Sequence, residues 1–389
     1  MLKSPIDTAV RMGAHGQRET HRMRSGSLPC QNRLFQVLLA FVLGSTIGGC
    51  GPAVSNTTGE ASSAKTNRQQ PQSGPVLKEY VLQGSKLQVP FSVVFDARQR
   101  LWFNSFYQYL GMIRSDGRIV AHRFQKWYYD RLQVNGGMTL GPDRRVWFTD
   151  FYDENFGVVE STGHIKQYQP FGTAYGYGYT SGIVSARGHL WMLVIGSYGP
   201  GESLVELDTT PSIVKVINLP SDDCWAIPIT ADSGGTLWIG NGPHCPEITR
   251  VATDDKVTNF SVPHAADGVW AIASGPDGNV WFAAADGPEI NPYIGKMTPK
   301  GVLTTYPISD QANGITLGPD GNWWITMPFV GKVATMSLEG KILTEYTLPG
   351  AWKHSQPRFQ TGKIVLGPDG NLWFAEANRN KIGELRFTK

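Results

Sequence analysis

Short stretches in which apolar and polar residues alternate recur along the chain from about residue 76 to its end. Val302–Tyr306 and Ile342–Leu348 are examples, and an alternation with period two is typical of strands that bury one face. Short apolar runs such as Ile315–Leu317 precede turns of the form Gly-Pro-Asp-Gly, where Pro presets φ and Gly ends the turn. The pattern therefore predicts an all-β chain of short strands and tight turns.

The strands and turns follow one order that repeats seven times. An apolar strand leads into the turn, a strand with Trp follows, then a variable loop, a strand such as Ile294–Met297, a second turn and an alternating strand. The clearest copies are Gly275–Phe282 and Gly367–Phe374. The aligned tryptophans, spaced by 43 to 49 residues, are Trp102, Trp147, Trp191, Trp238, Trp281, Trp324 and Trp373. Seven copies at this pitch predict a seven-bladed β-propeller of four-stranded antiparallel blades.

The last repeat is one strand short. It ends with its third strand at Lys381–Leu385, whereas Val76–Leu82, at the other end of the repeats, has the pattern of the fourth strand Ile342–Leu348. We therefore expect the N-terminal strand to pair into the last blade. Closing the ring in this way removes open sheet edges.

The repeated tryptophans and aspartates have structural explanations. A Trp at the same place in every copy is expected to pack between blades rather than to form a ligand platform. The aspartates of the turns are expected to form those turns rather than to act as catalytic carboxylates; they are Asp143, Asp277, Asp320 and Asp369.

Residues 1–49 are expected to be a signal peptide with an N-terminal extension, and translation starts at Met1 or at Met23. Arginines precede the apolar run Leu34–Leu43, which is shorter than the about 20 residues that span a bilayer. Ile47-Gly48-Gly49-Cys50 resembles a bacterial lipobox, whose Cys becomes the lipidated first residue. Residues 50–75 are then the lipidated Cys and a polar tether, and residues 76–389 are the propeller.

Removing the leader changes the charge of the chain. Residues 1–49 hold six Lys or Arg and two Asp or Glu, so the formal net charge of +3 becomes about −1 for the mature chain. No basic surface remains to neutralise phosphates, so we expect no nucleic-acid partner. We expect an exported, membrane-anchored monomer, in the periplasm or at the cell surface, with only its lipid in the membrane.

Two further cysteines remain after Cys30 and Cys50 are assigned to leader and anchor. Cys224 comes before the first strand of the fourth repeat and Cys245 follows its Trp strand, so both are expected on the same face of the propeller. An exported protein meets an oxidising compartment, which permits a disulfide between them.

The unit Gly-Pro-Asp-Gly-Asn-x-Trp-Phe, followed by Ile-Gly-x-Ile, resembles the repeat of the virginiamycin B lyase (streptogramin lyase) family over about residues 76–389. That resemblance implies a Mg²⁺-assisted elimination that opens the ring of type B streptogramins. It also implies a site made of a Glu-x-His-Gly-Ile segment, a Glu three residues after the Trp, and a His from the preceding blade.

The implied site transfers to this chain only in part. The sixth repeat has Gln311, Asn313 and Met327 at these positions, and the fifth has Trp270 and Ala284. The seventh keeps Glu376 after its Trp but has Gln360 and Gly362 in front. No repeat holds the complete set.

Other residues on the same face offer chemistry. His354 and Glu376 are the best acid–base pair, the alternative being a solvated His and an exposed Glu. An oxygen-rich site for Mg²⁺ or Ca²⁺, as in lactonase-type propellers, would consist of Asp150, Asn241, Asn313 and Glu376. The loops of this face are rich in aromatics, which suit ligand or protein recognition or simply pack the loops: Trp127, Tyr128, Tyr129, Tyr152, Tyr177 and Tyr198.

Two functions follow from these residues. The first is a binding module that holds a small molecule, a glycan or an envelope protein on the aromatic-rich face. The second is a metal-dependent enzyme, either a carbon–oxygen lyase or a lactonase-type hydrolase. An enzyme needs carboxylates that converge near the channel, whereas a binding module needs only shape and aromatic side chains.

Overall fold

The computed structural model describes residues 74–84, 86–105, 109–123, 135–150, 155–169, 178–196, 201–220, 224, 226–242, 245–286, 291–350 and 361–387. The predicted signal peptide, Cys50 and nearly all of the predicted tether lie outside these ranges. In the described part of the chain, no helix is long and apolar enough to cross a membrane.

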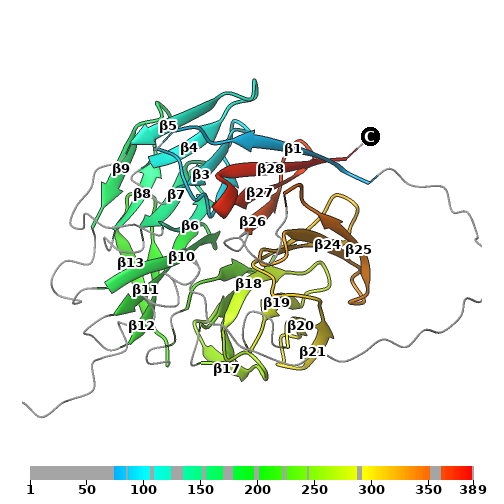
Figure 1. The fold of residues 1–389 in the computed structure, drawn as a ribbon. Coiled ribbons are helices and arrows are strands. Elements are labelled where there is room, and N and C mark those ends of the chain that lie inside the picture. Colours follow the sequence, from blue (N-terminus) through cyan, green and yellow to red (C-terminus); the bar gives the residue numbers. More distant parts are fainter. Residues whose placement is uncertain are drawn as a thin grey trace, which may run out of the picture. The chain divides into compact units, whose positions relative to one another are not determined.

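The described strands form seven separate four-stranded antiparallel sheets, the blades (Figure 1). Blade one comprises β2 (Val93–Phe95), β3 (Leu101–Asn104), β4 (Tyr109–Ile113) and β5 (Ile119–Arg123). Blade two comprises β6 (Asn135–Leu140), β7 (Val146–Asp150), β8 (Asn155–Val159) and β9 (Ile165–Tyr168). Blade three comprises β10 (Gly178–Ala186), β11 (His189–Gly196), β12 (Glu202–Leu207) and β13 (Ile213–Asn218). Blades four and five comprise β14 (Ile229–Ala231), β15 (Leu237–Gly240), β16 (Glu247–Val251) and β17 (Val257–Ser261); β18 (Val269–Ser274), β19 (Val280–Ala284), β20 (Tyr293–Met297) and β21 (Leu303–Pro307). Blades six and seven comprise β22 (Gly314–Leu317), β23 (Trp323–Met327), β24 (Lys332–Met336) and β25 (Ile342–Thr347); β26 (Thr361–Leu366), β27 (Leu372–Glu376), β28 (Lys381–Arg386) and β1 (Val76–Val81).

The ring is closed by the N-terminal strand, as the sequence predicts. β1 pairs antiparallel with β28 over its whole length, from Val76 opposite Arg386 to Val81 opposite Lys381. Figure 1 shows this pairing of the blue N-terminal strand with the red C-terminal one. The first strand of each blade contacts the first strands of both neighbouring blades, so these seven strands surround the axis of the ring: β2, β6, β10, β14, β18, β22 and β26.

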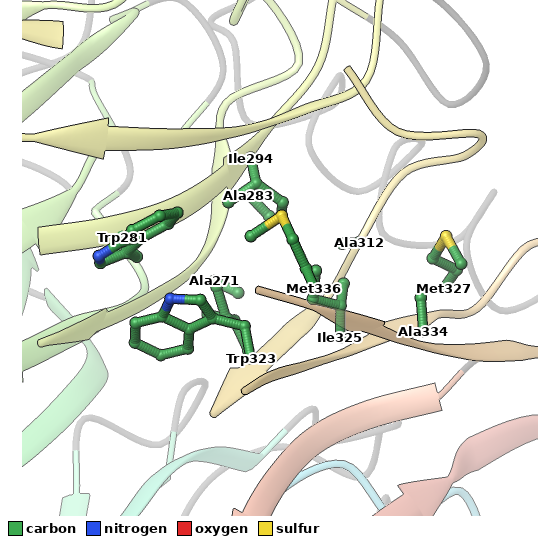
Figure 2. Close-up of a cluster of buried hydrophobic side chains, with 11 residues drawn as sticks. Ala271, Trp281, Ala283, Ile294, Ala312, Trp323, Ile325, Met327, Ala334 and Met336 are labelled. Atoms are coloured by element: carbon green, nitrogen blue, oxygen red, sulfur yellow. The ribbon is translucent and has the colours of Figure 1, made fainter. Parts of the chain in front are cut away.

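The seven repeated tryptophans pack between blades, which confirms the interpretation from the sequence. Trp281 of blade five, for example, lies in one cluster with Trp323, Ile325 and Met336 of blade six (Figure 2). Trp373 of blade seven packs in the same way against blade one, across the point of closure. Each of the seven is at most 6% exposed, so burial of these rings is what holds neighbouring blades together.

The turn before each Trp strand satisfies the indole N–H of that Trp. In blade six, Asp320 Oδ1 accepts a hydrogen bond from Trp324 Nε1 at 3.0 Å and another from the backbone of Asn322. Six blades share this pair: Asp96–Trp102, Asp143–Trp147, Asp232–Trp238, Asp277–Trp281, Asp320–Trp324 and Asp369–Trp373. The aspartates are thus turn formers, as predicted, and they also remove the cost of a buried unsatisfied donor.

The two glycines of this turn are needed for different reasons. A Cβ at Gly318 would lie 2.2 Å from Cδ1 of Trp324, because the indole ring packs directly on the turn. Gly321 has φ +76°, a left-handed conformation that side chains disfavour. The Gly-Pro-Asp-Gly motif is therefore required for the Trp to pack on the turn.

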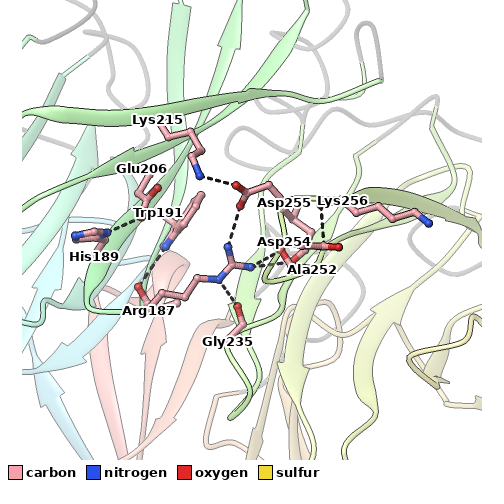
Figure 3. Close-up of polar contacts among 12 residues, drawn as sticks. Arg187, His189, Trp191, Glu206, Lys215, Gly235, Ala252, Asp254, Asp255 and Lys256 are labelled. Carbon is pink, nitrogen blue, oxygen red and sulfur yellow. Dashed lines mark hydrogen bonds and ion pairs between the residues drawn. The ribbon is translucent and has the colours of Figure 1, made fainter.

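Blade three replaces the aspartate turn by Arg187. The indole N–H of Trp191 donates to the carbonyl of Ala186 at 3.2 Å, and the Arg187 guanidinium lies over the ring, 4.9 Å from its centroid. Arg187 also bonds the carbonyls of Gly235 and Ala252 and pairs with Asp255 in blade four (Figure 3). One cation thus joins the two blades where the repeat motif is weakest.

A second pairing, between a Phe and a Gly, appears inside the blades. Where the residue after the Trp is Phe, the residue opposite it on the third strand is Gly: Phe103–Gly111, Phe148–Gly157, Phe282–Gly295 and Phe374–Gly383. A Cβ at Gly295 would lie 2.3 Å from Cζ of Phe282, because the phenyl ring covers the glycine. Blade six has Ile325 opposite Ala334, so a smaller side chain leaves room for a Cβ.

Each junction between neighbouring blades also carries a hydrogen bond near the axis. The bonds are Asn104 Nδ2 to Gly136 O, Thr149 Oγ1 to Ser181 O, Ser181 Oγ to Ala226 O, Val269 N to Asn241 O, Gln311 Nε2 to Asp267 Oδ2, Thr326 Oγ1 to Gly362 O and Lys363 N to Phe91 O. The inner strands are therefore fixed in height relative to one another, and this fixes the residues at their ends.

We expect Gly295→Ala to destabilise the protein by about 1–3 kcal/mol, because the added methyl group overpacks against Phe282. Changing Phe282→Ile in the same chain reproduces the Ile–Ala pair of blade six and should recover part of this loss. Urea unfolding of both single variants and the double variant measures the coupling. Strictly additive effects in this cycle would show that the two residues are independent.

Candidate functional site

One face of the propeller, here called the loop face, carries the beginning of each first strand and the end of each second strand. The strand register places these two points side by side, with Thr361 opposite Glu376 in blade seven and Val269 opposite Ala284 in blade five. Asp150, Asn241, Asn313 and Glu376, which the sequence analysis singled out, stand at or next to these strand ends. The other residues that it singled out for this face lie outside the described residues, namely His354, Trp127, Tyr128, Tyr129, Tyr152, Tyr177 and Tyr198.

Glu376, the predicted partner of His354, is fully buried, so the alternative of an exposed glutamate is wrong. Its Oε2 accepts from Arg379 Nη1 at 3.1 Å, and the same Arg379 nitrogen lies 2.6 Å from Oε1 of Glu79 on β1. Lys381 Nζ lies 2.6 Å from the other oxygen of Glu79. Two carboxylates and two cations thus form one cluster in the blade that closes the ring.

Burial raises the pKa of Glu376 to about 7, and the negative charge of Glu79 adds to this, although Arg379 and Lys381 oppose it. A carboxyl group with such a pKa exchanges its proton near neutral pH. Its cation partners also hold it within its own blade. The cluster therefore links proton exchange to the contact between β1 and the rest of blade seven.

The other residues of the predicted oxygen-rich metal site are buried or half-buried. Asp150 and Asn241 are fully buried, and the Asn241 amide donates to Thr249 Oγ1 at 3.2 Å within its own blade. Asn313 is half-buried and directly precedes the first strand of blade six. Within the described ranges, no three His, Cys, Asp or Glu side chains gather closely enough to hold a metal ion. The four-residue site stays a prediction.

A polar group that the sequence did not single out as a unit lies across blades five and six. Gln311 is 1% exposed and donates through Nε2 to Oδ2 of Asp267 at 3.2 Å. Burial raises the pKa of Asp267 to about 6, against the hydrogen bonds that it receives from Trp270 and Gln311. The carbonyl oxygens of Gln311 and Asn313 are buried and find no hydrogen-bond partner among the described residues.

This group occupies informative positions of the repeat. Gln311 and Asn313 stand where the resemblance implies a Glu and a His, Met327 stands where it implies a second Glu, and Trp270 stands where it implies the other His. An amide donates and accepts hydrogen bonds but does not take up a proton near neutral pH. The group can therefore orient a bound molecule, and Asp267 is its only titratable member.

The two loops of blade four on this face are tied together. Cys224 and Cys245 form a disulfide with Cα atoms 5.1 Å apart, and Gly242 N donates to Cys224 O at 2.7 Å. The start of the first strand and the end of the second are thereby held at a fixed separation. Asp222, Asp223 and His244, beside the two cysteines, lie outside the described residues.

Comparison with known proteins agrees with this fold. A family model described as the virginiamycin B lyase family matches residues 70–312 and 212–388. No curated protein sequence matches the chain.

Solved structures resemble the chain at low identity. A streptogramin B lyase has a TM-score of 0.66 at 22% identity, over 81% of this chain and 98% of that one. Virginiamycin B lyase from Staphylococcus aureus has a TM-score of 0.67 at 22% identity, over 80% and 99%. The extracellular domain of a putative hybrid two-component system from B. thetaiotaomicron has a TM-score of 0.56 at 16% identity, over 79% and 42%. At these identities the structures show a shared fold.

We expect the stability of the protein to fall as pH rises between about 4.5 and about 7, where the unfolded Glu376 has released its proton and the folded one still holds it. The loss should be on the order of 3 kcal/mol and constant above that window. Glu376→Gln removes this term, so wild type and variant should diverge between pH 4.5 and 8 in urea unfolding.

Glu339→Gln is the matched control. Glu339 is an exposed turn residue whose pKa is lowered by its hydrogen bond with Ser337, so it is charged across this range. Its difference from wild type should stay flat. Parallel curves for wild type and Glu376→Gln would mean that Glu376 has the same pKa in the folded and the unfolded protein.

Proposed function

The chain belongs to the virginiamycin B lyase family, and from this premise we propose that it is an exported, lipid-anchored propeller that binds a small molecule at its loop face without breaking a bond in it. One observation carries the proposal. Where the family pattern implies Glu-x-His, this chain has the amides of Gln311 and Asn313, and Met327 replaces the following Glu. General base catalysis needs a group that accepts a proton, and neither an amide nor a thioether does so near neutral pH.

The same residues suit binding. The carbonyl oxygens of Gln311 and Asn313 lack partners within the described ranges, and a buried unsatisfied acceptor costs about 1–3 kcal/mol. A ligand that offers N–H or O–H groups would remove this cost. Trp270 supplies an apolar ring beside Asp267, an arrangement that fixes the orientation of a small polar molecule.

The aromatic loops extend this proposal. Trp127, Tyr128, Tyr129, Tyr152, Tyr177 and Tyr198 belong by sequence to the loops of the same face. Rings with polar tips favour sugars, cyclic peptides and protein surfaces. A small molecule is the first choice because the amides of blades five and six are buried, whereas an envelope protein would have to reach them from the surface.

The anchor fits the topology of the ring. Cys50 and the tether 50–75 lead directly into β1, the strand that closes blade seven. Glu79 of β1 bonds both Arg379 and Lys381 at 2.6 Å, so the strand nearest to the anchor is held by charge as well as by its backbone.

The second candidate is a metal-dependent lyase or a lactonase-type hydrolase. It is favoured by Asp267 and Glu376, whose pKa values of about 6 and about 7 suit proton transfer near neutral pH. Either residue would then act as the base in place of the missing His.

Incubation with quinupristin, a homoserine lactone and an oligosaccharide, each with and without Mg²⁺ and Ca²⁺, separates the two candidates. We expect at least one compound to raise the melting temperature while its mass stays unchanged. Asn313→Ala should weaken that binding about tenfold, the worth of one or two hydrogen bonds. Asn218→Ala, on the outer strand of blade three, is the matched control and should not.

If the wild type converts any of these compounds, and Asp267→Asn or Glu376→Gln abolishes the conversion, the protein is an enzyme and the binding proposal is overturned. Failure of the whole panel to stabilise the protein would count against a small-molecule site at these amides.

Cys50→Ser tests the anchor. We expect wild type in the membrane fraction and the variant, still folded, in the soluble exported fraction, because a polar tether has no affinity for lipid of its own. Cys30→Ser, within the leader, is the control and should leave the fractionation unchanged. Membrane association of a Cys50→Ser chain whose leader has been cleaved, as its intact mass shows, would contradict a lipid anchor at this residue.

A further inference from the structure

One position of the innermost strands differs in blade seven from all the other blades. In every blade, the residue after each repeated Trp pairs with an apolar residue of the first strand, Ile315 in blade six and Ile364 in blade seven. The residues that directly precede these partners in blades one to seven are Ser92, Gly137, Gly182, Pro228, Ala271, Gly314 and Lys363. The first six are small, uncharged residues, and the seventh is a lysine.

The strand that carries Lys363 is held on both sides. Lys363 N donates to Phe91 O of blade one at 3.0 Å, and Thr326 Oγ1 of blade six donates to Gly362 O at 3.2 Å. Ile364, the next residue, is buried in the core against Trp324. Lys363 itself is exposed, and its strand β26 is one of the seven that surround the axis of the ring.

The surroundings of the amine are unusual for a lysine. Although the side chain touches solvent, the surrounding protein lowers the pKa of Lys363 by desolvation. No carboxylate among the described residues forms an ion pair with it; by contrast, Lys332, Lys381 and Lys296 each have one. The positive charge at the axis thus has no countercharge within the described protein.

Neighbouring residues add an apolar surface and hydrogen-bonding groups. Phe91, whose carbonyl accepts a hydrogen bond from Lys363 N, is 38% exposed and lies two residues before the innermost strand of blade one. Asn313 directly precedes Gly314, which holds in blade six the position that Lys363 holds in blade seven. The inner strands of the two blades lie close together here, since a Cβ on Gly314 would be 3.0 Å from Gly362 O. A cation, an aromatic ring and unsatisfied amide oxygens therefore occur on, or just before, the inner strands of three consecutive blades.

We propose that Lys363 is the anion-binding residue of this propeller, and that the ligand is a small carboxylate with an apolar or aromatic body. This inference rests on the proposed function, because it names the chemical class of the molecule held at the loop face. The carboxylate supplies the missing countercharge, Phe91 contacts the body of the ligand, and its N–H or O–H groups meet Gln311 and Asn313. A carboxylate pairs with the ammonium group in a partly desolvated site, so a charged ligand should bind more tightly than its neutral counterpart.

Benzoate and benzamide are the probes, since they share a ring and differ in charge. Calorimetric titration of the full mature chain at low salt should show benzoate binding, and benzamide binding at least about tenfold more weakly. Lys363→Met, a neutral substitution of similar volume, should lose about tenfold or more of the benzoate affinity and leave benzamide unchanged. Lys256→Met, on an exposed turn at the opposite face, should behave as wild type.

Equal affinity of wild type and Lys363→Met for benzoate would overturn the inference, and so would the absence of benzoate binding to a protein that binds another compound of the panel. The latter result would leave the binding function standing with a neutral ligand. Benzoate binding that depends on Lys363 but not on Asn313 would instead support the anion site and contradict the amide site. If Lys363→Met does not fold, Lys363→Gln takes its place with the same expectations.

Discussion

The fold depends on how a buried tryptophan satisfies its indole N–H. The rings are buried because they fill the space between blades, yet each carries a donor that water can no longer reach. In six blades the acceptor is the aspartate of the turn just before the Trp strand, and in blade three it is the carbonyl of Ala186, with Arg187 over the ring. A local turn thereby sets the geometry of a contact between blades.

This local rule explains why the architecture could be predicted from the sequence. The turn, its aspartate and the Trp lie within seven residues of one another, so every copy leaves the same short pattern. The seven blades and the closing strand Val76–Val81 follow from counting and aligning these copies, and both predictions are confirmed. The pairing of Phe282 with Gly295 joins residues of different strands, and no short motif records which residues face each other.

The candidate site could be predicted only in outline for the same reason. Its face follows from the strand order, but its contacts join distant residues: Gln311 meets Asp267 across two blades, and Arg379 meets Glu79 from the other end of the chain. The sequence indicates Glu376 as an acid–base residue. Its surroundings, however, include Glu79 of β1, which is about 300 residues away in the sequence. Lys363 stands out only when the seven inner strands are aligned by register.

The two faces of the propeller therefore carry different constraints. The turns that bind the tryptophans lie at one face. A change in such a turn exposes the indole N–H or leaves it buried without an acceptor. At the loop face the ends of the strands are already fixed by hydrogen bonds between backbones and inner side chains, such as Thr326 to Gly362 and Val269 to Asn241. Side chains such as those of Asn313 and Lys363 can then differ from the family pattern without disturbing the packing between blades. Because the tryptophans and turns that join the blades are different residues from the polar side chains at the loop face, membership of the family fixes the scaffold of this chain but not what its loop face does.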